Sequence, residues 1–264
     1  MNSVSLQYGN NLKGNIMKKI LCLVVTTVMC VSAYAQERKM PVMGERTVMD
    51  VNIEEFSGLC MAPDGSYLLA CGDGGVVNKL SFDGEVTDVW SHKGDTEGIT
   101  IDPTTGHIYL AIERTQNVYR VDAPDYKTHS VILTVQEAVD GRYWNDGLEA
   151  VEYYKDDILF VGSQRNANLW QFKTDGTMIS KISLSGFAKE IAGLCYDPVA
   201  DWLWVVDSIG FKIYICTVDG ELLATYDVSD IENAESICID RERNCVWVGS
   251  DEDYPKVYRY SFEF

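Results

Sequence analysis

The sequence predicts an all-β protein, a single five-bladed β-propeller of four-stranded antiparallel blades that is closed by an N-terminal strand. The first observation is a motif that recurs five times, as Phe-Ser-Gly-Leu, Thr-Glu-Gly-Ile, Leu-Glu-Ala-Val, Ile-Ala-Gly-Leu and Ala-Glu-Ser-Ile, at residues 56–59, 96–99, 148–151, 191–194 and 234–237. The second is the spacing of 40, 52, 43 and 43 residues between successive copies. The third is that each copy opens a series of short apolar runs separated by turn residues, a pattern typical of a propeller blade.

The second repeat shows the unit most clearly. Residues 98–102 predict the inner strand, and Pro-Thr-Thr-Gly at 103–106 predicts the turn after it. The next three strands are expected at residues 107–112, 117–121 and 130–135. The fourth repeat follows the same plan, with strands expected at residues 194–196, 202–206, 212–217 and 222–226.

The last repeat has room for only three strands before the chain ends. These strands are expected at residues 237–240, 246–249 and 257–262. Residues 46–51, just before the first repeat, alternate in polarity as a strand does. We therefore predict that this segment becomes the outer strand of the last blade, closes the ring and covers an edge that would otherwise invite aggregation.

The N-terminal residues predict a secretory signal peptide. Lys18 and Lys19 precede an apolar run at 20–31, and Ala33-Tyr34-Ala35 supplies small residues for cleavage. The apolar run is about 12 residues long, shorter than the roughly 20 that span a bilayer. We expect residues 17–35 to direct export, residues 1–35 to be removed, and residues 36–264 to form one periplasmic or secreted domain. Lipid anchoring at Cys30 stays open, although the bulky Met29 precedes it.

The composition argues against nucleic acid as a partner. The chain has a net charge of −18, and removal of the three lysines in residues 1–35 would take it to −21. No stretch after residue 35 is apolar and long enough to cross a membrane. We expect a monomer whose partner is a small molecule, a sugar or a peptide.

Six cysteines remain after residue 35. Three of them, Cys60, Cys195 and Cys238, occupy the same place in three repeats, which favours a small core residue over a bridge. We expect buried free thiols; disulfides are the alternative, because an exported chain permits them.

Acidic residues recur where two strands of each blade should meet. The inner strand starts at the rim of the channel at which the second strand ends, so both sets of side chains converge there. The starts are Ser57, Glu97, Glu149, Ala192 and Glu235, and the ends are Asp73, Glu113, Gln164, Asp207 and Asp251. We predict Glu97, Glu149 and Glu235 as metal ligands. The predicted ligand-binding residues are Asp73, Glu113, Arg114, Gln164, Arg165, Asp207 and Asp251.

Crowded carboxylates point to a bound cation. Like charges raise one another's pKa, and a divalent ion removes that conflict. Oxygen ligands without His or Cys favour Ca²⁺. The alternative is a water-filled polar funnel, with the acids solvated or paired with Arg114 and Arg165.

The five openings, in their order, resemble those of the SdiA-regulated family of bacterial β-propellers, over about residues 55–262. Those chains open their inner strands with Ser-Gly, Glu-Gly, Glu-Gly, Ser-Gly and Glu-Gly. This chain departs from them at Ala150, Ala192 and Ser236, and has Gln164 where the family has an acid. The resemblance implies an exported propeller with an acidic channel able to hold calcium.

Two functions fit these observations. The first is an exported binding protein with an acidic channel that holds a calcium ion, its ligand not readable from the sequence. The alternative is a metal-dependent hydrolase, similar to the lactonase or phytase propellers, in which the ion polarises a carbonyl or phosphoryl oxygen and Glu97 or Glu149 acts as base. Such hydrolases commonly add asparagine, histidine or basic residues in the channel, and here only Arg114 and Arg165 are candidates. The sequence therefore favours a binding protein over an enzyme.

The longer connection at 136–147 is expected to form a rim loop, with a role in binding or as a plain cover.

Overall fold

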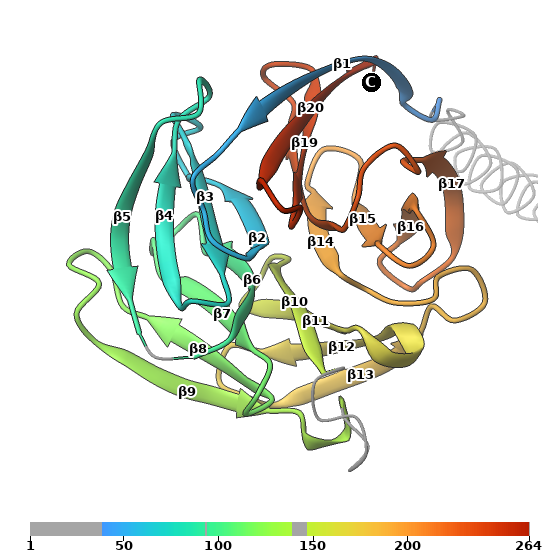
Figure 1. Cartoon of the computed structure of the whole chain (residues 1–264). Coiled ribbons are helices and arrows are strands. Elements are labelled where there is room, and N and C mark those ends of the chain that lie inside the picture. Colours follow the sequence, from blue (N-terminus) through green and yellow to red (C-terminus); the bar gives the residue numbers. More distant parts are fainter. Residues whose placement is uncertain (1–38, 93, 139–146, 264) are drawn as a thin grey trace, which may run out of the picture. The chain divides into compact units, whose positions relative to one another are not determined.

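Five antiparallel sheets of four strands each surround a central axis in the computed structural model (Figure 1), which describes residues 39–92, 94–138 and 147–263. No α-helix occurs in these ranges; two short 3₁₀ helices, η1 (Gln136–Ala138) and η2 (Arg165–Ala167), lie in connections. The five-bladed propeller predicted from the repeat is therefore confirmed. Contacts between residues group positions 41–264 into one compact unit, which is the propeller.

Each blade runs from an inner to an outer strand, and four blades are built from consecutive strands. Blade 1 comprises β2 (Phe56–Met61), β3 (Leu68–Gly72), β4 (Val76–Leu80) and β5 (Val86–Ser91). Blade 2 comprises β6 (Thr96–Ile101), β7 (Ile108–Ile112), β8 (Asn117–Val121) and β9 (His129–Thr134). Blade 3 comprises β10 (Leu148–Tyr153), β11 (Ile158–Ser163), β12 (Asn168–Lys173) and β13 (Met178–Ser183). Blade 4 comprises β14 (Gly193–Asp197), β15 (Trp202–Asp207), β16 (Lys212–Thr217) and β17 (Leu222–Asp227).

Blade 5 joins the two ends of the domain. It comprises β18 (Ala234–Asp240), β19 (Cys245–Ser250), β20 (Lys256–Glu263) and, as its outer strand, β1 (Val42–Asp50). Figure 1 shows β1 alongside β20. The two strands pair antiparallel from Val42 opposite Glu263 to Asp50 opposite Lys256. Closure by an N-terminal strand is confirmed, and the strand begins four residues earlier than the sequence predicted.

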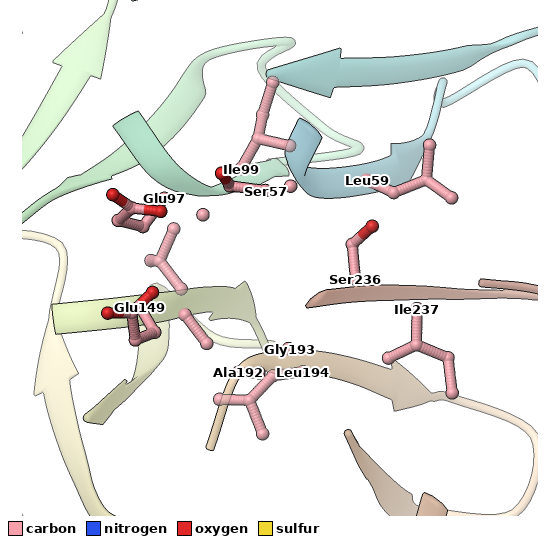
Figure 2. Close-up of a pocket in the computed structure, with 14 residues that line it drawn as sticks. Ser57, Leu59, Glu97, Ile99, Glu149, Ala192, Gly193, Leu194, Ser236 and Ile237 are labelled. Carbon is pink, nitrogen blue, oxygen red and sulfur yellow. The ribbon is translucent and has the colours of Figure 1, made fainter. Parts of the chain in front are cut away.

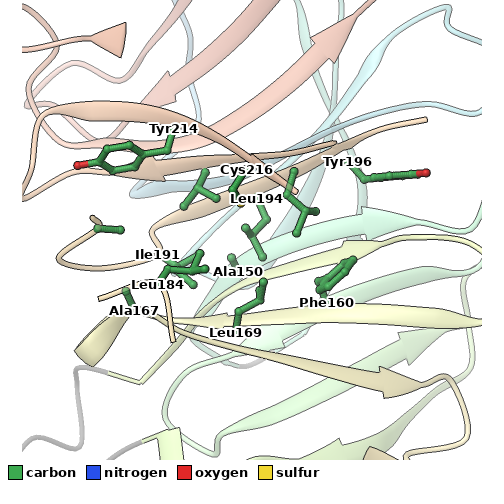
Figure 3. Packing of buried hydrophobic residues seen from close by; sticks show 13 residues of the cluster. Ala150, Phe160, Ala167, Leu169, Leu184, Ile191, Leu194, Tyr196, Tyr214 and Cys216 are labelled. Carbon is green, nitrogen blue, oxygen red and sulfur yellow. The ribbon is translucent and has the colours of Figure 1, made fainter. Parts of the chain in front are cut away.

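The core consists of layers between neighbouring blades. Between blades 3 and 4, for example, Phe160 and Leu169 pack with Leu203 and other buried residues (Figure 3). Similar apolar clusters fill the seams between blades 1 and 2, 2 and 3, and 5 and 1. Between blades 4 and 5, the ring of Trp204 lies edge-on to Phe262 at 5.2 Å. Each sheet therefore buries both of its faces, because a single four-stranded blade cannot bury them alone.

All six cysteines in the described part of the chain are buried and free. Cys60, Cys71, Cys238 and Cys245 belong to the two apolar clusters that flank blade 1. The expectation that the repeated cysteines are core residues is met. Cys195 and Cys238 lie on neighbouring inner strands, and their side chains are hydrogen-bonded to each other.

Thiol labelling of the mature protein, unfolded in denaturant without reductant, is expected to count six reactive cysteines. The physical reason is that each thiol is packed as a small apolar side chain rather than bridged. A reduced and unfolded sample serves as the control. A count of four would contradict the free state, and Cys195 with Cys238 would be the pair to examine first, because they are in contact.

Several features predicted from the sequence lie outside the described residues. These are the signal peptide, Cys30 and most of the connection at 136–147. Within the described part, no helix is long and apolar enough to cross a membrane.

Candidate functional site

Four of the five inner strands carry a β-bulge at the same position. The ladders of β2, β6, β10 and β18 each pass over one residue on the inner strand, and these residues are Ser57, Glu97, Glu149 and Glu235. A bulged residue is left out of the ladder, and its side chain is re-aimed. The bulge also explains why β6 and β18 begin earlier than predicted. The polar opening residue lies inside the strand rather than in front of it.

The inner strands enclose a narrow pocket on the axis (Figure 2). Ser57, Glu97 and Glu149 are among the residues that line it, and its volume of about 10 Å³ is room for about one water. The strands approach closely because of glycine. A Cβ on Gly98 would lie 2.7 Å from the Glu149 carbonyl oxygen, and one on Gly193 would lie 2.5 Å from that of Glu235. Figure 2 shows Glu97 and Glu149 on neighbouring strands at one side of this pocket.

A repeated backbone hydrogen bond brings the strand ends to the strand starts. The N–H groups of Asp73, Glu113, Gln164 and Asp251 each donate to the carbonyl two residues before the opening residue, at distances of 3.2, 3.0, 2.9 and 3.0 Å. The acceptors are Glu55, Asp95, Gly147 and Asn233. The predicted meeting of the two sets of residues at one rim is therefore confirmed for four blades. We call the polar residues at the starts of the inner strands, at the ends of the second strands and two positions before each start the acidic rim.

Three carboxylates of the acidic rim form a tight group between blades 1 and 2. One oxygen from each of Asp73, Asp95 and Glu97 lies within 4.8 Å of the others. The Ser57 hydroxyl donates to Asp73 Oδ1 at 2.8 Å, and Arg114 forms an ion pair with Asp95. Arg114 neutralises one of the three charges, so two remain in close contact.

A second contact joins blades 2 and 3. Glu113 Oε1 accepts a hydrogen bond from the Gly147 N–H at 3.0 Å, and the Glu113 carboxylate is also hydrogen-bonded to Glu149. Burial, together with the charges of Glu97 and Glu113, raises the pKa of Glu149. Glu97 and Glu149 are 8% and 7% exposed, so solvent screens their charges poorly.

A third group lies between blades 4 and 5. Glu235 is hydrogen-bonded to Ser208 and lies near the buried Glu190. Glu190 Oε1 accepts the Ile209 N–H at 2.7 Å, whereas its Oε2 has no hydrogen-bond partner among the described residues. Blade 4 itself contributes no acid at the opening position. Its strand β14 begins at Gly193, and the Ala192 N–H bonds the Val206 carbonyl at 3.0 Å.

Burial and mutual repulsion raise the pKa values of these carboxyl groups. Burial, followed by the charges of Asp73, Glu113 and Asp95, raises the pKa of Glu97 to about 9. Burial is also the main cause for Asp73, whose pKa rises to about 6, and for Glu235, whose pKa rises to about 7. The pKa of Glu149 rises well above its usual range for the same reasons. Near neutral pH the folded protein therefore holds protons on the rim that a bound cation would displace.

Not every predicted residue joins the rim in the same way. Asp207 is fully buried, and its carboxylate accepts hydrogen bonds from the backbone N–H groups of Lys189 and Gly210 at 2.8 and 2.6 Å. Because its carboxylate already accepts hydrogen bonds from the neighbouring loops, we do not include Asp207 in the proposed ligand set. Gln164 and Arg165 lie half-buried at the start of η2. The carboxylate of Asp251 accepts the Phe56 N–H.

Two acids of the rim were not singled out in the sequence. Asp95 and Glu190 are 5% and 2% exposed, and each lies two positions before an opening residue, Glu97 and Ala192 respectively. The sequence contains a signal for these two acids, because acidic residues recur two positions before the opening residue of the repeat. Only the structure shows that these side chains turn towards the others.

The geometry allows a test of the predicted calcium ligands. Ca²⁺ binds oxygen at 2.3–2.6 Å, so two ligands of one ion lie no more than about 5 Å apart. The group of Asp73, Asp95 and Glu97 meets this limit, with Ser57 beside it. Glu149 and Glu235 are not members of that group. Of the three predicted metal ligands, Glu97 is the one that belongs to this group of three carboxylates.

Comparisons with known proteins support the fold and the family. Among solved structures, 1421 chains match, so the architecture is widely shared. One is the crystal structure of a nidogen/laminin complex, with a TM-score of 0.55 and 14% identity over 74% of this chain and 72% of that chain. At this identity the likeness shows the fold alone. The search of curated proteins finds no match. The model of the SdiA-regulated family matches residues 166–263, which contain the last two of the five strand openings, so the predicted resemblance to this family is confirmed over that part of the chain.

Proposed function

We propose that this protein is an exported binding protein whose acidic rim holds a calcium ion and recognises a small molecule, sugar or peptide. The carrying observation is the cluster of Asp73, Asp95 and Glu97, with oxygens within 4.8 Å of one another. The predicted signal peptide supports export. The residue types support calcium, because carboxylate and hydroxyl oxygens are the ligands it prefers.

The ion has a definite electrostatic role in this proposal. Glu97 is buried and the partly buried Asp73 lies close to it, so their simultaneous ionisation is unfavourable without a cation. An ion bound between them would hold both in the charged form. The charge of Glu97 raises the pKa of Glu149, so Glu149 would respond to the same ion.

Thermal melting in millimolar calcium and in excess chelator tests the proposal. A ligand that binds only the folded state adds about 2.7 kcal/mol at a hundredfold excess over its dissociation constant. For a domain of this size, that corresponds to a rise of roughly 5–10 °C in Tm. If Tm is the same in the two buffers, the calcium proposal is wrong and the alternative of a water-filled polar funnel stands.

The variant Glu97→Gln sharpens the calcium test. It keeps the shape of the side chain and removes one ligand charge, so the calcium-dependent rise in Tm should largely disappear. In chelator the variant should melt no lower than the parent, because burial disfavours the charge of Glu97. Glu85→Gln, at an exposed position outside the rim, is the charge-matched control and should keep the full rise.

A further inference from the structure

A second cavity lies off the axis, on the side of blade 1 that faces blade 5. Its volume is about 260 Å³, and it is lined on one side by Asn52, Ile53 and Glu54 of the segment that joins β1 to β2. The opposite side is formed by Gly72, Gly74, Val76, Asn78 and Asp88 of blade 1. A volume of 260 Å³ far exceeds the roughly 10–15 Å³ that one water needs on the same measure. The cavity therefore has room for a small organic molecule.

The alternation of β4 shows which face of the sheet forms the floor. Val76 and Asn78 line the cavity, whereas Val77 between them packs with the cluster between blades 1 and 2. Leu80, the next residue on the cavity face, packs in the cluster between blades 5 and 1. The cavity thus lies at the seam where the ring closes, and a molecule in it would contact both the joining segment and blade 1.

Asn78 is an uncommon residue for such a floor. It is 5% exposed, and its Nδ2 makes only a long 3.4 Å hydrogen bond to the Val76 carbonyl. Within the described part of the chain, no group donates to its Oδ1. Its Oδ1 is not among the side-chain atoms of the described residues that are sealed from solvent without a partner. Asn78 therefore offers an acceptor to a molecule in the cavity.

The walls are rich in acceptors and acidic. Glu54 and Asp88 contribute carboxylates, Asn52 contributes an amide, and the lining residues that the structure describes include no basic one. Asp88 is directly opposite Asn78 across the ladder between β4 and β5. Ile53 and Val76 supply apolar surface beside these groups. A ligand that carries a positive charge and several hydrogen-bond donors on a compact frame would satisfy this lining.

We propose that this seam cavity, formed by Asn52–Glu54, Gly72, Gly74, Val76, Asn78 and Asp88, binds a small organic cation that carries hydroxyl groups, of the amino-sugar type. Its ammonium group contacts Glu54 and Asp88, and its hydroxyl groups bond Asn78 and Asn52. The site is separate from the metal cluster of the acidic rim and does not rest on the calcium proposal. Its test needs no calcium.

Gly74 permits a direct steric test. A Cβ added at Gly74 would meet nothing within 4 Å, and its backbone is not in the left-handed region, so a side chain can be added at this wall of the cavity without strain. Gly74→Val should narrow the cavity and leave the fold intact. Gly186 has the same open surroundings in the connection between β13 and β14, so Gly186→Val is the matched control.

The measurement is binding of D-glucosamine by saturation-transfer NMR and calorimetry, in chelator, with D-glucose as the neutral compound of similar shape. The parent and Gly186→Val should bind glucosamine more tightly than glucose. Gly74→Val should bind both sugars more weakly than the parent does. Asn78→Leu, which keeps the volume but removes the amide, should weaken binding of glucosamine by about tenfold or more.

A charge variant tests the cationic part of the proposal. In the double variant Glu54→Gln, Asp88→Asn, the preference for glucosamine over glucose should disappear, because the two sugars differ in the ammonium group. Absence of glucosamine binding by the parent would overturn the proposal. So would equal binding by the parent and Gly74→Val, which would place the sugar elsewhere, for example at the acidic rim. If calcium does not raise Tm, the sugar-binding results are unaffected, because they are measured in chelator. The calcium proposal and the sugar proposal can therefore be contradicted independently.

Discussion

A protein that begins at Val51, and therefore lacks β1, is expected to unfold or aggregate under conditions in which a protein that begins at Pro41 stays folded. The strand contributes seven paired residues to β20. It also carries Arg46, which forms an ion pair with Asp230 and lies over the ring of Tyr258 at 5.2 Å. At about 1 kcal/mol for each net hydrogen bond, the loss is comparable with the 5–15 kcal/mol that stabilise a typical domain.

The exposed pattern of β1 shows the source of this effect. Most of its side chains face solvent, so the strand stabilises the ring through backbone pairing more than through apolar burial. Without it, β20 presents an unpaired edge, which favours association between molecules. Circular dichroism, melting and size-exclusion chromatography of the two proteins give the comparison. Equal melting of both proteins would show that the ring holds without its outer closing strand.

The second large effect is expected at Glu152, a fully buried carboxyl group that links three blades. Its Oε1 accepts the Tyr196 N–H of blade 4 at 2.9 Å, and its Oε2 contacts the Thr100 hydroxyl of blade 2 at 2.9 Å. Burial raises the pKa of Glu152 to about 8 from a model-compound value of 4.5. The folded state therefore holds a proton that the unfolded state releases above about pH 4.5.

The sign of the pH dependence follows from this raised pKa. The stability contributed by protonated Glu152 is fully present below about pH 4.5 and is lost as the pH rises through about 8. At about 1.4 kcal/mol for each pH unit, the loss across this window amounts to a few kcal/mol. Asp73, Glu97 and Glu235 act in the same direction, so the parent should be less stable at pH 8 than at pH 5 in chelator.

The variant Glu152→Gln should flatten this dependence. A glutamine mimics the protonated group, because its oxygen can accept the Tyr196 N–H and its amide can donate to the Thr100 hydroxyl oxygen. Urea unfolding at pH 5 and pH 8 should show nearly equal stability for the two proteins at pH 5 and a more stable variant at pH 8. Glu152→Leu, which leaves the Tyr196 N–H without a partner, should be less stable at both pH values by about 1–3 kcal/mol. An unchanged difference between pH 5 and pH 8 in Glu152→Gln would contradict this account.

The fold was predictable because each repeat carries its own signals. The openings, the turn residues and the three-strand final repeat together imply the blade, the ring and its closing strand. The bulges were not predictable, because alternation alone cannot show that Glu97 or Glu235 is left out of its ladder. The strand boundaries predicted in blades 2 and 5 therefore start too late.

The site was predictable in position but not in its partners. The sequence places Glu97, Glu149 and Glu235 at the rim, yet it cannot show which oxygens meet. Asp95 joins Asp73 and Glu97, and Asp207 is engaged by backbone N–H groups, because the side-chain directions in these loops depend on neighbouring blades. The pairing of Arg114 with Asp95 likewise emerges only from the packed structure.

The bulges separate the recognition chemistry of this protein from its architecture. Since Ser57, Glu97, Glu149 and Glu235 stand outside their ladders, changing one of these side chains removes no hydrogen bond from the sheet's own framework. Four positions around one axis can thus vary in charge and size while the ring persists, as the serine and the three glutamates already illustrate. The scaffold is therefore suited to diversification, in nature or by engineering, in which new specificities are combined blade by blade.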